Sequence, residues 1–132
     1  EFSHASIMCN VLKLPQVSKL IQVGVRDVSA KEVAFAEEDK RVVLHHDMGL
    51  KRSRYAGQSW YALCQQIVAG LPEQVYVSFD IDGLDPKLCP STGTPVPGGL
   101  ELDEAFCLLR EVADTRVLST EVEITHDELI DF

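Results

Sequence analysis

Hydrophobic residues recur along this chain with two different spacings, one typical of helices and one of strands. Helical spacing, bounded by capping residues, Gly or Pro, predicts helices over residues 5–14, 29–39, 60–70 and 102–113. Short, nearly all-apolar runs predict strands over residues 19–25, 41–44, 74–79 and 116–122. Because such strands alternate with helices, we expect a three-layer α/β/α fold, with a mainly parallel sheet covered by helices on both faces.

The clearest local signal begins the helix over 29–39. Ser29 is followed three residues later by Glu32, which is the spacing of a capping box. Ser59 is expected to cap the helix over 60–70, because it directly precedes the apolar run.

Two segments between these elements are polar. Residues 47–57 predict a loop that contains the basic run Lys51-Arg52-Ser53-Arg54, which we interpret as solvated. Residues 80–100 are rich in Gly, Pro and Thr and also predict a loop. A loop of about 20 residues is uncommon inside a compact domain unless it has a function. Its prolines and glycines predict a stiff segment that approaches other backbone closely.

The composition is that of one soluble globular domain. The chain has 132 residues, of which 45% are hydrophobic and 25% charged. Its net charge of −9 argues against nucleic-acid binding, because phosphate neutralisation needs basic residues. No apolar stretch approaches the ~20 residues that span a membrane, so we expect no membrane partner.

The cysteines show no sign of a zinc site or a disulfide framework. They stand at positions 9, 64, 89 and 107 and form no C-x-x-C pair. Cys9, Cys64 and Cys107 fall among apolar residues of predicted helices, where we expect buried free thiols. Reduced cysteines and an acidic composition together predict a cytoplasmic location.

Two carboxylates directly follow the strand over 74–79. Asp80 and Asp82 are two residues apart, a spacing that puts both side chains on one face of an extended chain. Paired carboxylates repel unless a cation lies between them or one is protonated. Oxygen ligands suit a hard divalent ion such as magnesium, calcium or manganese, and parallel sheets bind ligands at the carboxyl ends of their strands. The alternative is structural, with Asp82-Gly83 in a turn and Asp80 capping nearby amides.

The residues around this pair form two recognisable strings. Residues 78–86 read S-F-D-I-D-G-L-D-P and residues 92–100 read T-G-T-P-V-P-G-G-L. Together they resemble the C-terminal signature of the ureohydrolases, the family of arginase, agmatinase and formimidoylglutamase. F-S-H-A at residues 2–5 and V-G-V-R-D at residues 23–27 resemble two further motifs of that family.

The resemblance implies an enzyme that hydrolyses a guanidino compound of the agmatine or arginine type. The reaction cleaves a linear C–N bond and releases urea, and it uses two manganese ions bridged by a hydroxide. Asp80 and Asp82 match metal ligands. Thr94 matches a threonine that lines the guanidinium pocket, and His4 matches a histidine that passes protons to the leaving amine. Relatives assemble as trimers or hexamers, so the resemblance also implies a homo-oligomer.

Two further positions extend the match. Asp85 corresponds to a third aspartate that is not a ligand, and we expect it to fix the turn by hydrogen bonds. Glu123 matches the glutamate that pairs with the substrate guanidinium if the strand lacks one residue, whereas an ungapped alignment places Ile124 there.

Two metal motifs of the family, G-G-D-H and D-A-H-x-D, do not occur in this sequence. The run His45-His46-Asp47 is not their substitute, and we expect it to begin a polar loop. Residues 1–132 therefore correspond to the C-terminal part of a single ureohydrolase domain, which we expect to be inactive alone. The alternative is a non-catalytic remnant or interaction domain that retains the arginase-like scaffold. The D-x-D spacing by itself also allows a metal-ion sensor or a carboxylate-metal phosphatase.

Overall fold

The computed structural model describes residues 7–93 and 95–118. Helices and strands alternate through most of this part of the chain, as the hydrophobic spacing predicts. The helices are α1 (Ile7–Val11), α2 (Ala30–Glu38), α3 (Asp47–Tyr55), α4 (Trp60–Ala69) and α5 (Leu102–Thr115). The strands are β1 (Leu20–Val25), β2 (Val42–His46), β3 (Gln74–Val75) and β4 (Val117–Leu118), and a short 3₁₀ turn, η2, covers Ile81–Gly83.

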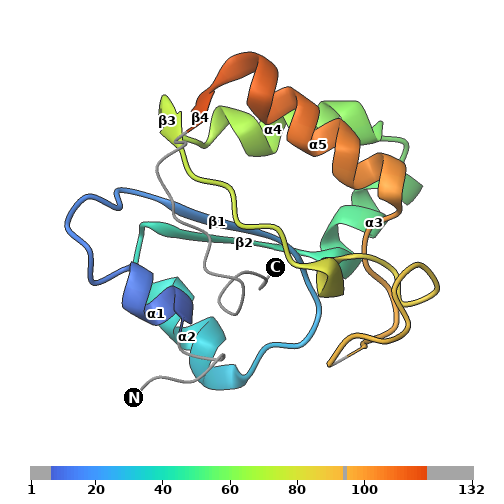
Figure 1. The fold of residues 1–132 in the computed structure, drawn as a ribbon, viewed down its shortest axis with the longest axis horizontal. Coiled ribbons are helices and arrows are strands. Elements are labelled where there is room, and N and C mark those ends of the chain that lie inside the picture. Colours follow the sequence, from blue (N-terminus) through green and yellow to red (C-terminus); the bar gives the residue numbers. More distant parts are fainter. Residues whose placement is uncertain (1–6, 94, 119–132) are drawn as a thin grey trace.

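The strands pair in parallel, which confirms the predicted fold class. β1 pairs with β2 from Leu20 opposite Val42 onwards, and β3 pairs with β4 in a separate two-stranded sheet. Figure 1 shows α1 and α2 on one side of the strands and α4 and α5 on the other, in three layers. This arrangement is the expected α/β/α architecture, with two small two-stranded sheets in the part described.

The start of α2 confirms the capping box. The backbone N–H of Ser29 donates to Glu32 Oε2 at 2.7 Å, and the N–H of Glu32 donates to Ser29 Oγ at 3.3 Å. Ser59 likewise caps α4, because its Oγ accepts from the N–H of Ala62 at 3.2 Å. Both caps depend only on residues three positions apart, so they follow directly from the sequence.

The predicted loop over 47–57 is wrong, because α3 forms there. Leu50 is buried and packs against Leu63 and Ile67 of α4, so tertiary packing stabilises a helix whose composition is mostly polar. The charges fit the helix dipole, with Asp47 in the first turn and Arg52 and Arg54 in the last. His45 and His46 correspondingly end strand β2 rather than begin a loop, and only Asp47 starts the next element.

The basic run within α3 is also not simply solvated. Lys51 Nζ donates to Asp47 Oδ2 at 2.9 Å, and Arg54 pairs with the buried carboxylate of Glu104 on α5. The Arg54 guanidinium lies 6.0 Å from the centre of the Trp60 ring, whose Nε1 donates to the Glu104 carbonyl oxygen at 2.9 Å. These contacts join α3, α4 and α5 at one end of the helical layer.

The predicted strand over 74–79 is shorter in the structure. Only Gln74 and Val75 form a ladder, opposite Val117 and Leu118 of β4. A ladder needs a neighbouring strand of matching length. Among the described residues, no strand lies opposite positions 76–79, so they continue towards η2 without regular pairing.

The core lies between the sheet and the helical layer of α4 and α5. Its buried residues form three clusters, composed of Leu50, Leu63 and Ile67, of Val68, Val75 and Val112, and of Leu84, Leu100 and Ala105. Trp60 packs against the first and third clusters. The third cluster lies beside η2, so the core directly supports the turn that carries Asp80 and Asp82.

The cysteines are free thiols, and their burial differs from helix to helix. Cys64 on α4 is buried, with its Sγ 4.0 Å from the Sγ of half-buried Cys107 on α5. The prediction of a buried Cys9 is wrong, because α1 is only five residues long and buries none of them. No helix in the described ranges is long and apolar enough to cross a membrane.

Candidate functional site

The predicted carboxylate pair lies on η2, at the end of the segment that leaves β3. Asp80 is the N-cap of this turn, is only 3% exposed, and accepts the N–H of Asp82 through Oδ1 at 2.6 Å. The structure therefore contains the capping bond of the structural alternative. This bond does not exclude metal binding, because an ionised carboxylate has two oxygens with about four acceptor positions.

Both aspartates line the same cleft. It has a volume of about 750 Å³ and lies between β1, β2, α1, α2 and η2. Gly24, Arg26 and Asp27 at the end of β1 line it together with Asp80 and Asp82. Figure 1 shows η2 at the end of the sheet where β1 and β2 finish. The pair is thus at the carboxyl edge of parallel strands, where the sequence placed the site.

Arg26 connects this edge to the aspartate turn. Its Nη1 donates to the carbonyl oxygens of Gly24 and Gly83, each at 3.3 Å, and its Nη2 donates to the carbonyl oxygen of Asp82. The register of β1 on β2 shifts between Val23 and Val25, which leaves Gly24 as an extra residue. Such a bulge re-aims the residues that follow it, and here Arg26 follows.

The glycine-rich loop makes the close backbone approach that its composition predicts. Leu84 bridges Leu100 in parallel, the Leu100 N–H donates to the Gly83 carbonyl oxygen at 3.0 Å, and the Asp85 N–H donates to the Leu100 carbonyl oxygen at 2.9 Å. Gly99 has φ +101°, and a Cβ there would lie 2.7 Å from the backbone of Leu84. The loop is therefore fixed against the turn by its main chain.

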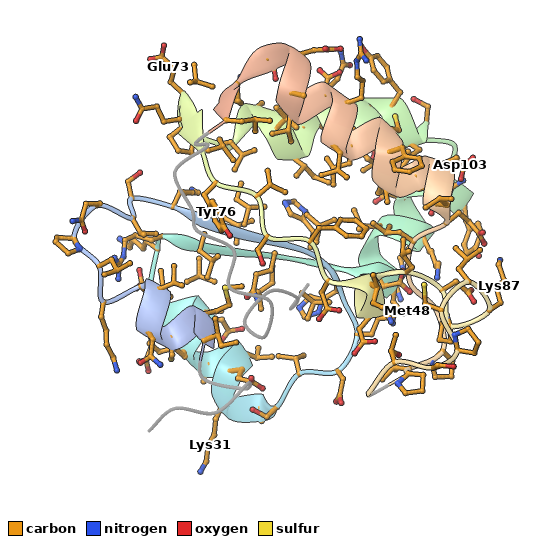
Figure 2. The ribbon with its side chains drawn as sticks, in the orientation of Figure 1. Lys31, Met48, Glu73, Tyr76, Lys87 and Asp103 are labelled. Carbon is orange, nitrogen blue, oxygen red and sulfur yellow. The ribbon has the colours of Figure 1, made fainter. Side chains whose placement is uncertain are left out.

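Asp85 fixes the turn by a hydrogen bond, as expected. Its Oδ1 accepts the N–H of Lys87 at 3.0 Å, so the carboxylate closes the chain locally. The Lys87 side chain pairs with Glu101 and lies at the outer edge of the loop (Figure 2).

Asp47 is a buried carboxylate near this edge that the sequence did not single out as functional. It is 3% exposed and bound to Lys51, and a Cβ on Gly98 would lie 2.7 Å from its Oδ2. In the sequence, Arg26 stands out only as part of the V-G-V-R-D string. For both, the available signal was a charged residue that directly follows the end of a parallel strand, β1 for Arg26 and β2 for Asp47, in a fold whose ligands bind at the carboxyl ends of strands.

Three predicted site residues, His4, Thr94 and Glu123, lie outside the described residues and stay predictions. Of the predicted set, Asp80 and Asp82 are the two that lie among the described residues, and both line the cleft. Within residues 7–93 and 95–118, no group of three or more His, Cys, Asp or Glu side chains is placed to hold a metal ion. Two carboxylates on one turn offer the oxygen ligands that a hard divalent cation prefers.

The model of the Arginase family matches residues 1–125, which is most of the chain. The chain belongs to the arginase family. Among curated relatives, the agmatinases of Escherichia coli O7:K1 and Salmonella newport are each 35% identical to it over 124 residues. Those 124 residues are 92% of this chain and 37% of each relative, so the chain spans little more than a third of their length.

Solved structures of arginase-family proteins have the same fold. A hypothetical agmatinase from Burkholderia thailandensis superposes with a TM-score of 0.70 at 24% identity, over 89% of this chain and 34% of that protein. An arginase from Bacillus caldovelox superposes with a TM-score of 0.63 at 28% identity, over 85% of this chain and 38% of that protein. This chain contains the α/β architecture of the family in incomplete form.

Proposed function

We propose that this chain is the C-terminal part of an enzyme that hydrolyses a guanidino compound at a linear C–N bond and releases urea. A single observation carries the proposal. Asp80 and Asp82 lie on one turn at the carboxyl edge of parallel strands and line one cleft, in a chain whose curated relatives are agmatinases. Agmatine and arginine are the substrate types that fit the family.

Asp80 and Asp82 are the residues of this chain that would hold manganese. When bound, the metal would supply an activated water at neutral pH and would neutralise negative charge that develops on the substrate. The remaining ligands would come from the part of the enzyme outside this chain. We infer that the chain alone is inactive, because two carboxylates on one turn hold a divalent ion weakly.

The cleft is lined by charges of both signs. The acidic residues Asp27, Glu32, Asp80 and Asp82 outnumber the basic residues Arg26 and Lys31. This excess of acidic side chains favours the binding of cations, and manganese would neutralise the pair of Asp80 and Asp82. His4 as proton carrier, Thr94 in the guanidinium pocket and Glu123 as its ion-pair partner complete the proposal. Assembly into trimers or hexamers and a cytoplasmic location belong to it as well.

The test uses the complete protein that contains this chain, loaded with manganese. Urea release from agmatine and from arginine is measured for the wild type, Asp80→Asn and Asp82→Asn. The control is Asp114→Asn, which removes the same charge from an exposed ion pair with Arg110 on α5. We expect both ligand variants to lose activity and bound manganese, and the control to keep both. Full activity in Asp80→Asn would overturn the metal-ligand assignment.

The second candidate is a non-catalytic domain that keeps the arginase-like scaffold. It is favoured by the small number of metal-ligating side chains that the described residues gather. The upstream coding sequence separates the two candidates. An enzyme requires the G-G-D-H and D-A-H-x-D motifs there, and a coding sequence that starts at Glu1 would make the chain inert.

A further inference from the structure

Arg26 is hydrogen-bonded to the turn that carries Asp80 and Asp82. It donates to the carbonyl oxygen of Asp82, a residue 56 positions further along the sequence. We propose that Arg26 is a positioning residue, which sets the direction of the Asp82 carboxylate without touching metal or substrate. The inference rests on the proposed function, because it assigns Asp82 to the metal.

The hydrogen bonds fix the main chain on both sides of Asp82. Its N–H donates to Asp80 Oδ1 at 2.6 Å, and its carbonyl oxygen accepts from Arg26 Nη2. The two peptide planes that flank the Asp82 Cα are therefore both held. Since the side chain leaves from this Cα, holding both planes limits where the carboxylate can point.

Arg26 also connects the turn to two other parts of the site. The Gly83 carbonyl oxygen accepts from Arg26 Nη1 at 3.3 Å and from the Leu100 N–H at 3.0 Å, so the strand edge and the glycine-rich loop meet on one oxygen. A Cβ on Gly98 would lie 3.2 Å from Arg26 Cδ, which places the loop directly over the arginine stem. The guanidinium is thereby enclosed between β1, η2 and the loop.

An arginine suits this position better than a lysine. The planar guanidinium holds its donors in a fixed fork, so one side chain can bond the carbonyl oxygens of Gly24, Gly83 and Asp82 together. A lysine ammonium carries the same charge as a point on a flexible stem. Comparing arginine with lysine at position 26 therefore distinguishes positioning by the guanidinium from a simple effect of positive charge beside Asp82.

Arg116 provides a matched control. It is a half-buried arginine that also donates to main-chain carbonyl oxygens, to Val68 at 2.7 Å and to Thr115 at 3.0 Å. Its bonds tie α5 to α4 and do not involve the turn. A loss that comes only from weakened folding should appear equally in variants of Arg116.

The experiment compares Arg26→Gln, Arg26→Lys and Arg116→Gln in the complete protein. Manganese affinity is measured by titrating the metal-free protein and following the electron paramagnetic resonance signal of unbound Mn²⁺. Melting temperature, kcat and KM are measured alongside. We expect Arg26→Gln to lower manganese affinity about 10- to 100-fold, as is usual when a residue supporting a metal ligand is lost. Arg26→Lys should recover only part of this loss, and Arg116→Gln should lower the melting temperature while leaving manganese affinity unchanged.

Two results would overturn the inference while leaving the proposed function standing. One is wild-type manganese affinity in Arg26→Gln or in Arg26→Lys, and the other is an equal loss of affinity in Arg116→Gln. If Arg26→Gln does not fold, the comparison of Arg26→Lys with the wild type decides the question. A wild-type protein that binds no manganese and releases no urea would refute the proposed function, and this inference with it.

Discussion

Replacing Gly99 by alanine should destabilise the fold through a contact that can be isolated experimentally. Gly99 has φ +101°, and its added Cβ would lie 2.7 Å from the carbonyl carbon and oxygen of Leu84 and 2.9 Å from the nitrogen of Asp85. These are backbone atoms of a segment held by the Leu84–Leu100 bridge. They cannot rotate away as the end of a side chain would, so the methyl group must displace the main chain.

Two effects add in this variant. A non-glycine residue in a sparsely populated backbone region costs about 1–3 kcal/mol. Forcing extra atoms into a packed region costs about 1–3 kcal/mol more. We therefore expect Gly99→Ala to lower the free energy of unfolding by about 2–6 kcal/mol.

Gly57 separates the two effects. It has φ +98°, and a Cβ there meets no atom within 4 Å. Gly57→Ala therefore has the backbone strain without the clash. Urea unfolding followed by far-ultraviolet circular dichroism gives the free energy of unfolding for the wild type and both variants. We expect Gly99→Ala to be less stable than Gly57→Ala by about 1–3 kcal/mol. Equal losses would refute the close approach of Gly99 to Leu84 as the reason for glycine there.

Two further predictions concern pH. Burial and the neighbouring Cys107 raise the pKa of the Cys64 thiol from 9.0 to about 12. Iodoacetamide should therefore label exposed Cys9 well before Cys64, and peptide mass spectrometry would show the order of labelling. The unfolded thiol ionises first, so stability should fall as the pH rises from 9.0 to about 12, and urea unfolding of Cys64→Ala should lack this fall. Burial lowers the pKa of His45 below 6.5, so the unfolded chain takes up a proton first and stability should drop as the pH falls below 6.5. The urea concentration at the unfolding midpoint should depend less on pH in His45→Gln than in the wild type. An unchanged dependence on pH would show that this histidine does not cause the loss of stability.

The sequence predicts best what depends on neighbouring residues. The capping box of Ser29 and Glu32 forms as expected, because both partners lie within one helical turn. Helix α3 was missed because its stability comes from Leu50 packing on α4, a contact that the local composition does not reveal. Residues 76–79 were overestimated as a strand because their apolar pattern says nothing about whether a neighbouring strand is present.

The candidate site shows the same difference between local features, which the sequence predicts, and long-range contacts, which it does not. Asp80 and Asp82 could be located, because an apolar strand that runs into two carboxylates marks a strand end. Arg26 could not be assigned its contacts with Gly83 and Asp82. Those bonds depend on a register shift in β1 and on a loop far along the sequence that returns to the same place. His4, Thr94 and Glu123 remain predictions from the sequence.

Trp60 is the only tryptophan in the sequence, and its position makes it an optical probe of this molecule. Its ring packs against the cluster that holds α3 on α4 and against the cluster of Leu84 and Leu100 beside the aspartate turn. The indole N–H is bound to a carbonyl oxygen of α5. Separation of α5 from this end would bring water to the ring and shift its fluorescence emission to longer wavelength. The emission of this one tryptophan thus reports whether the helical layer still supports the glycine-rich loop, without any label being added.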